Sequence, residues 1–289
     1  MRSVLFGAAV AGVLVSSSHA ADLPLKAPAV APLPAAIGWT GWYVGANAGY
    51  HMGSGGVSTA ADPGPFDVPG AFGAESIVAA ALATNSGAPR QRGFIGGGQI
   101  GYNWQFAPQW VAGLEADIQG LSGTGSATIV GTSAVPGFPT EAFSSTTQVT
   151  KKVEWLSTLR GRVGILATPA LLAYATGGLA VGQVKATTTI AQTDTGINGA
   201  LTGTGATAGS ISQTRAGWAL GGGAEWKFAP HWSVKGEYLH YDLGSVTWNS
   251  ANMITNVTGF GTPTYSAANI RSSTRFQGDI VRAGLNYLF

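Results

Sequence analysis

The sequence has no cysteine and little charge. Of its 289 residues, 15 are Lys or Arg and 13 are Asp or Glu, which gives a net charge of +2. Without cysteine the chain has no disulfide framework, no thiolate metal site and no catalytic thiol. So few basic residues argue against a nucleic-acid-binding protein, which needs a dense basic surface. The low charge also argues against a disordered polar chain. After the N-terminal region, no apolar run reaches the roughly 18 residues of a spanning helix.

The first twenty residues have the pattern of a secretory signal peptide. Arg2 supplies the positive start, and the apolar run from Val4 to Val15 is too short to span a bilayer as a helix. Small residues at positions 18 and 20 predict cleavage between Ala20 and Ala21. The alternative is a short transmembrane anchor. Residues 21–38 are rich in Pro and Ala and predict an extended linker, so the folded domain is expected over residues 39–289.

From residue 42 onward the chain alternates with a period of two. Between Trp42 and Tyr50, even-numbered apolar residues alternate with Tyr43 and with small or polar residues such as Gly45 and Asn47. This alternation is typical of a β-strand with one apolar face. Seven more segments show it, which are residues 94–104, 110–120, 153–165, 171–181, 218–228, 232–241 and 281–289.

The connections between these eight segments alternate in length. Residues 105–109, 166–170 and 229–231 form short turns that contain Pro. Residues 51–92, 120–151, 184–215 and 244–273 are long and rich in Gly, Ser, Thr, Ala and Pro, so we expect mobile loops there. The pattern predicts an all-β, antiparallel, up-and-down transmembrane barrel of eight strands, with short periplasmic turns and four long extracellular loops.

The inward-facing positions of such a barrel collect ten charged residues. An eight-stranded barrel is narrow enough for side chains to fill it, so five acids and five bases are expected to pair as an interior network. Inward glycines such as Gly45, Gly49 and Gly101 leave room for these side chains. A polar pore lining is the alternative. The ten residues are Glu115, Asp117, Glu154, Arg160, Arg162, Glu225, Lys227, Lys235, Glu237 and Arg282.

Aromatic residues cluster at the ends of the predicted strands. Amphipathic rings favour the two membrane interfaces, so we expect two aromatic girdles. The periplasmic girdle is expected from Trp42, Trp104, Trp110, Trp226, Trp232 and Tyr287, with Trp39 and Phe289, and the outer one from Tyr50, Phe94, Trp155 and Trp218.

Motifs for catalysis and ligand binding are weak. Gly96, Gly98 and Gly101 match a dinucleotide-binding fingerprint, but they lie inside an alternating strand and no helix follows. His51, His231 and His240 have no metal-ligand spacing. His240 lies near Asp242 and Ser245 at the predicted outer rim, without the spacing of a nucleophile and its base. We therefore predict no catalytic residue, cofactor or metal.

Several segments resemble the OmpA-like eight-stranded outer-membrane barrels of Gram-negative bacteria, and in particular the outer-membrane immunogenic protein or porin-family branch. They are the segments at residues 41–45, 101–105, 172–178, 237–238 and 281–289. The resemblance implies the outer membrane as location. It also implies that Leu285, Tyr287 and Phe289 form the signature read by the barrel-assembly machinery. The loops are unusually long for such a barrel, and no peptidoglycan-binding domain is expected after the last strand.

These observations favour a structural, surface-exposed envelope protein without enzymatic activity, whose interior is closed by the charge network. A small porin for ions or small solutes is the alternative, and a lipid-modifying barrel enzyme is a remote one. The expected partners are outer-membrane lipid, lipopolysaccharide and the barrel-assembly machinery, with no nucleic acid. The oligomeric state stays open.

Overall fold

A computed structural model describes residues 38–64, 73–196, 202–257 and 265–289. The expected signal peptide and all but the last residue of the linker lie outside the described residues. Within the described ranges, no helix is long and apolar enough to cross a membrane. The elements are β1 (Gly41–Ser54), β2 (Val57–Pro63), α1 (Gly73–Ala83), β3 (Asn85–Gly87), β4 (Arg92–Ala107), β5 (Trp110–Leu121), β6 (Gly125–Val135), β7 (Phe138–Thr168), β8 (Leu171–Asp194), β9 (Gly203–Ala229), β10 (Trp232–Asn249), β11 (Met253–Val257) and β12 (Tyr265–Leu288).

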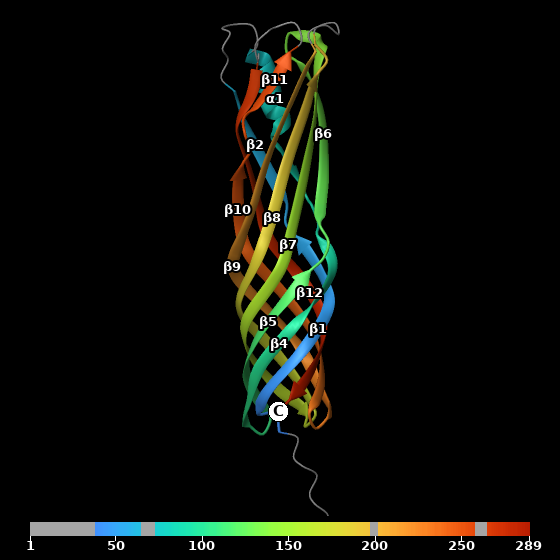
Figure 1. Cartoon of the computed structure of the whole chain (residues 1–289), viewed down its shortest axis with the longest axis vertical. Coiled ribbons are helices and arrows are strands. Elements are labelled where there is room, and N and C mark those ends of the chain that lie inside the picture. The colour runs from blue at the N-terminus through green and yellow to red at the C-terminus, as the bar shows by residue number, and fades with distance from the viewer. Residues whose placement is uncertain (1–37, 65–72, 197–201, 258–264) are drawn as a thin grey trace, which may run out of the picture. The chain divides into compact units, whose positions relative to one another are not determined.

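Eight of the strands close into an antiparallel ring, in the order β1, β4, β5, β7, β8, β9, β10 and β12 (Figure 1). The ring closes where β1 pairs with β12, from Tyr43 opposite Leu288 to Ser54 opposite Gln277. Closure leaves the ring without a free edge, so each of the eight strands has a paired neighbour on both sides. The expectation of an eight-stranded antiparallel barrel is confirmed.

Tight turns join neighbouring strands at one end of the barrel. Pro108 and Gln109 separate β4 from β5, Pro169 and Ala170 separate β7 from β8, and Pro230 and His231 separate β9 from β10. Proline suits these positions because it has no N–H to donate to a ladder. The three short turns of the sequence pattern therefore lie at the same end of the ring (Figure 1).

The part of the ring next to these turns is apolar outside and polar inside. We call it the proximal band, and on β4 it extends from Phe94 to Trp104. On β4, Phe94 and Trp104 are 76% and 59% exposed, whereas the inward Gln99 and Asn103 are buried. Inward glycines make space for interior side chains, because a Cβ at Gly101 would lie 2.3 Å from the Tyr43 ring. The predicted alternation therefore holds in this band.

Beyond the proximal band the chain continues in a distal extension built of strands and one helix. β7, β8, β9 and β12 run on without a break, and β2, β3, β6 and β11 add further pairing. The expectation of mobile loops over residues 51–92, 120–151, 184–215 and 244–273 is therefore wrong for most of the described residues. The period of two persists there: Val184, Ala186, Thr188 and Ile190 are buried, and the residues between them face outward.

The distal extension has the opposite polarity to the proximal band. Its interior is an apolar core that includes Val149, Leu156, Leu243, Trp248 and Phe276. Its outward positions carry mostly Thr, Ser, Gln and Lys, as on β8 between residues 183 and 193. The distal extension thus has the burial pattern of a water-soluble β-structure on top of a barrel with the reverse pattern.

Helix α1 lies in the distal extension, at the end of the barrel opposite the tight turns (Figure 1). Its alanine-rich sequence favours a helix, and Glu75 stands in its first turn, where a negative charge suits the helix dipole. Val78, Ala79, Ala80 and Ala83 are buried against β7, β8, β11 and β12 residues. Gln192 of β8 donates a hydrogen bond to the Ala79 carbonyl at 2.8 Å, so the helix is joined to the wall of the extension.

Candidate functional site

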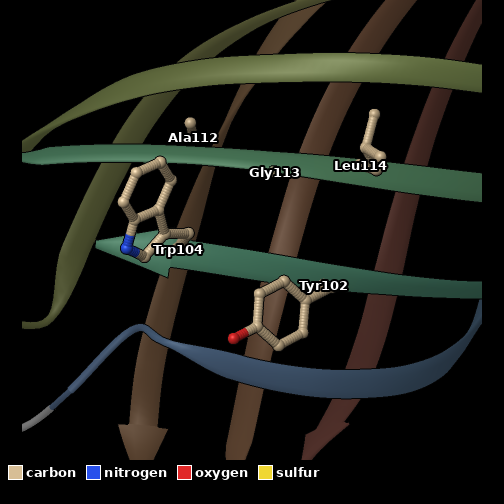
Figure 2. Close-up of a pocket in the computed structure, with 5 residues that line it drawn as sticks. All are labelled: Tyr102, Trp104, Ala112, Gly113 and Leu114. Atoms are coloured by element: carbon tan, nitrogen blue, oxygen red, sulfur yellow. The ribbon is translucent and has the colours of Figure 1, made fainter. Parts of the chain in front are cut away.

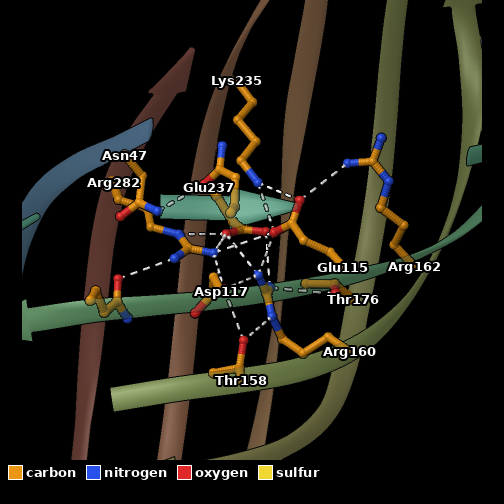
Figure 3. A network of polar contacts seen from close by, with 12 residues as sticks. Asn47, Glu115, Asp117, Thr158, Arg160, Arg162, Thr176, Lys235, Glu237 and Arg282 are labelled. Carbon is orange, nitrogen blue, oxygen red and sulfur yellow. Dashed lines mark hydrogen bonds and ion pairs between the residues drawn. The ribbon is translucent and has the colours of Figure 1, made fainter. Parts of the chain in front are cut away.

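The centre of the proximal band holds four carboxylates and four cations whose side chains are at most 2% exposed. Figure 3 labels all of them except Glu225. They come from β5, β7, β9, β10 and β12, so the ion pairs cross the lumen from one wall to another. The charges balance, as burial of this many ions requires. The eight residues are Glu115, Asp117, Arg160, Arg162, Glu225, Lys235, Glu237 and Arg282.

Arg160 connects three of the four carboxylates. Its guanidinium lies 2.7 Å from Glu115, 2.8 Å from Asp117 and 3.0 Å from Glu237. Its Nε also donates to the hydroxyl of Thr158 at 2.8 Å. The planar fork of five donors suits Arg to such multiple contacts. Arg160 is therefore the central cation of the network.

Arg282 repeats this bridging from the opposite wall of the ring, on β12. One terminal nitrogen lies 2.8 Å from Asp117, and its Nε donates to Glu237 at 2.7 Å. The other terminal nitrogen donates to the amide oxygen of Gln119 at 3.1 Å. Asp117 and Glu237 therefore each face two guanidinium groups.

Glu115 and the rings beside it hold the remaining cations. The Lys235 ammonium lies 2.6 Å from Glu115, and the Tyr43 hydroxyl donates to the same carboxylate at 2.6 Å. The Arg162 guanidinium lies between two rings, 5.1 Å from the centre of Tyr43 and 5.0 Å from that of Tyr174. Such cation–π contacts stabilise a desolvated guanidinium.

Glu225 forms the part of the network nearest the turns. It accepts from Arg162 at 2.9 Å, from the Ser233 hydroxyl at 2.5 Å and from the Asn286 amide at 2.9 Å. Sequence reasoning did not select the neutral members Tyr43, Tyr174 and Asn286. Their inward parity was the available signal, because each alternates with outward apolar residues on its strand.

Two of the ten predicted network residues lie elsewhere. Glu154 faces outward, with ion pairs to Lys185 at 2.9 Å and Lys152 at 3.6 Å, so its assignment to the interior is wrong. The cause is an irregularity in the β7–β8 register between Val153 and Leu156, which changes which residues face inward. Lys227 faces the lumen but has no ion pair among the described residues.

Lys227 instead contacts residues at the turn-side mouth of the barrel. Its ammonium lies 4.6 Å from the centre of the Trp39 ring and donates to the Gly38 carbonyl. Trp39 is fully buried, and its indole N–H donates to the Pro169 carbonyl at 3.0 Å. The expectation that Trp39 belongs to an outward girdle is therefore wrong. Its ring packs with Val111 and Leu172 inside the mouth.

The other predicted girdle residues face outward. The six near the turns are 36–59% exposed, and on the distal side Tyr50, Phe94 and Trp218 are 39%, 76% and 47% exposed, with Trp155 half-buried. Rings contact one another across strands, as in Trp42 with Tyr102 at 5.3 Å and Tyr50 with Phe94 at 5.6 Å. Their position at the membrane interfaces stays a prediction.

The outer face near the turns also has a shallow apolar groove of about 550 Å³. Figure 2 shows Tyr102 and Trp104 on one strand and Ala112, Gly113 and Leu114 on the next. The groove exists because Ala112 and Gly113 are small beside large neighbours. Its lining is almost wholly apolar, so it matches a hydrocarbon chain better than a polar ligand.

The C-terminal residues complete the ring. Leu285, Tyr287 and Phe289 face outward and are 46%, 36% and 71% exposed. The Phe289 backbone N–H donates to the Trp42 carbonyl at 3.0 Å, and its ring packs on Tyr287 at 5.3 Å. The terminal aromatic is thus anchored to β1, while its recognition by assembly machinery stays a prediction.

The three histidines among the described residues have different partners. His51 is buried and lies 2.6 Å from the Tyr241 hydroxyl, and His231 contacts the Leu288 carbonyl in a turn. His240 faces outward beside Trp218 and lies 2.9 Å from Asp279. The remote catalytic alternative combines His240, Asp242 and Ser245, and in the structure Asp242 is paired with Arg275 and not with His240.

A family model described as "Outer membrane protein beta-barrel domain" matches residues 8–276. The 31 kDa outer-membrane immunogenic proteins of Brucella melitensis and Brucella suis are each 35% identical over the full length of both chains. Among solved structures, Neisserial surface protein A (NspA) aligns over 86% of this chain and 98% of its own, with 12% identity and a TM-score of 0.31.

Proposed function

This chain belongs to the outer-membrane β-barrel family, and from that premise we propose that it is a closed barrel with a structural, surface-exposed role in the envelope. Its place is the outer membrane. The proposal includes the orientation with the short turns in the periplasm and the distal extension outside the cell. It also includes the absence of catalysis, with outer-membrane lipid, lipopolysaccharide and the barrel-assembly machinery as partners.

The observation that carries the proposal is the occupation of the lumen at three successive levels. Trp39 and its apolar neighbours fill the turn-side mouth, the eight-residue charge network crosses the middle, and the apolar core fills the distal extension. A water-filled pore needs a continuous polar path. Apolar layers on both sides of the network favour the closed barrel over the small porin.

Planar-bilayer recording of the purified, refolded protein tests this proposal. We expect no steady ion conductance for the natural sequence. Reproducible ohmic openings that change in size in an Arg160→Ala variant would contradict it, because they would place this side chain in the ion path. Lys185→Ala is the matched control, since Lys185 lies on the outer face and its removal leaves the lumen unchanged.

A further inference from the structure

A polar cavity of about 530 Å³ lies on the outer wall of the distal extension, away from the lumen and the charge network. It is formed by β2, by β12 and by the end of β10 with the residues that follow it. Six of its seven lining residues carry hydrogen-bonding side chains, and the seventh is Ala60. The six are Asp62, Asn249, Ser250, Asn252, Asn269 and Arg271.

The cavity depends on an irregularity in the β12–β2 pairing between Ala268 and Arg271. There Asn269 adopts a left-handed conformation with φ of 49°, which Asn tolerates better than most residues. Its backbone N–H donates to the Asn252 side chain, and its amide donates to Asp62, both at 3.2 Å. Side chains from three segments are thus held around one space.

Two features of the lining leave binding capacity that the fold does not use. Ser250 is 8% exposed and its hydroxyl has no hydrogen-bond partner. Asp62 accepts a hydrogen bond from the Asn269 amide, but neither Asp62 nor the oppositely charged Arg271 forms an ion pair among the described residues. A buried hydroxyl without a partner costs free energy, and unpaired charges on one cavity remain available to a ligand.

The chemistry of the lining selects the class of ligand. Binding pockets for most small molecules are lined mainly by apolar and aromatic side chains, whereas this cavity offers amides, a hydroxyl, a carboxylate and a guanidinium. Amides can both donate to and accept from sugar hydroxyls, a carboxylate accepts from them, and a guanidinium binds a carboxylate with two parallel hydrogen bonds. The lining therefore complements a ligand rich in hydroxyls that bears one carboxylate.

We propose that this cavity binds a carboxylated saccharide, with Arg271 on the carboxylate and Asp62, Asn252 and Asn269 on the hydroxyls. The cavity is separate from the lumen, so a negative result for saccharide binding would leave the proposed envelope role unaffected. Such sugars occur in bacterial envelope glycans and on animal cell surfaces. Sugars from both sources carry the hydroxyls and the carboxylate that the lining complements. The choice of probe therefore distinguishes the two sources.

Calorimetric titration of the full refolded protein in detergent tests the site. The probes are 3-deoxy-octulosonic acid for the bacterial source and N-acetylneuraminic acid for the animal source, each compared with its methyl ester. We expect at least one free acid to bind about tenfold more tightly than its ester. Arg271→Gln should remove that difference, because the ester and the acid then meet the same neutral side chain.

Two further variants control the experiment. Arg92→Gln removes the same charge from an exposed position on β4 outside the cavity and should leave binding unchanged. Asn269→Gly keeps the left-handed backbone accessible while it removes the amide, so it should weaken both acid and ester. Equal binding of acid and ester, an Arg271→Gln variant that binds as the natural protein does, or binding of acidic peptides alone would each overturn the proposal.

Discussion

Replacing Arg160 by Met tests how far the charge network stabilises the barrel. The guanidinium contacts three carboxylates at 2.7–3.0 Å, and its side chain is fully buried. Its loss leaves four carboxylates with three cations in the network. Removing one partner of a buried pair costs about 3–5 kcal/mol. We expect about 3 kcal/mol, because Glu115 keeps Lys235, and Asp117 and Glu237 keep Arg282.

Urea unfolding in lipid vesicles, followed by tryptophan fluorescence, measures this cost. The double variant Arg160→Met with Asp117→Asn restores the charge balance and should recover much of the lost stability. Lys185→Met is the control, because it removes an ion pair with Glu154 whose two side chains are 47% and 31% exposed. It should lower the free energy of unfolding by at most about 1 kcal/mol. A loss in Arg160→Met no larger than in Lys185→Met, or a double variant less stable than the single one, would refute the reasoning.

Three further predictions concern other parts of the chain. In the distal extension, burial and then the neighbouring Asp194 and Glu75 raise the pKa of Glu141 to about 7, above its usual 4.5. Stability from this protonated carboxyl is complete below pH 4.5 and is lost as the pH rises through 7. The protection of α1 amides, corrected for the intrinsic pH dependence of exchange, should therefore fall over that range, and Glu141→Gln should weaken this dependence. Gly101→Ala should lower the free energy of unfolding by about 1–3 kcal/mol, because its Cβ would meet the Tyr43 ring at 2.3 Å, whereas Gly120→Ala, with no atom within 4 Å, should not. Deletion of Phe289 should lower the amount of assembled protein in outer-membrane fractions, and normal amounts would count against the assembly signature.

Strand number and facing in the proximal band could be predicted from the sequence because the rule behind them is local. Side chains of a strand alternate between two faces, so the parity of Arg160, Arg162 and Arg282 was enough to place them inside. The same rule could not identify which carboxylate each cation meets. Those pairings depend on the stagger of strands that are far apart in the sequence.

The errors have particular physical causes. Glu154 was misplaced because an irregularity in one pairing changes the parity of its strand, and nothing in the local sequence marks it. The prediction for Trp39 is wrong because this residue precedes the first strand. An aromatic side chain there can face into the barrel or away from it, depending on the direction of the chain at the mouth. The distal strands were missed because their Thr, Ser and Ala alternation resembles the composition of loops, although Thr is favourable in strands.

The reversal of polarity between the proximal band and the distal extension fixes how deeply the barrel is immersed. On β8, the outward Leu179 is 62% exposed and, five residues later, the inward Val184 is fully buried. In the proposed orientation, a barrel displaced outward would expose its apolar belt to water, and one displaced inward would move the Thr and Gln side chains of β7 and β8 into hydrocarbon. Either displacement is opposed by a restoring free energy that grows with distance. The sequence therefore encodes the vertical position of the protein as well as its fold, independently of any aromatic anchor.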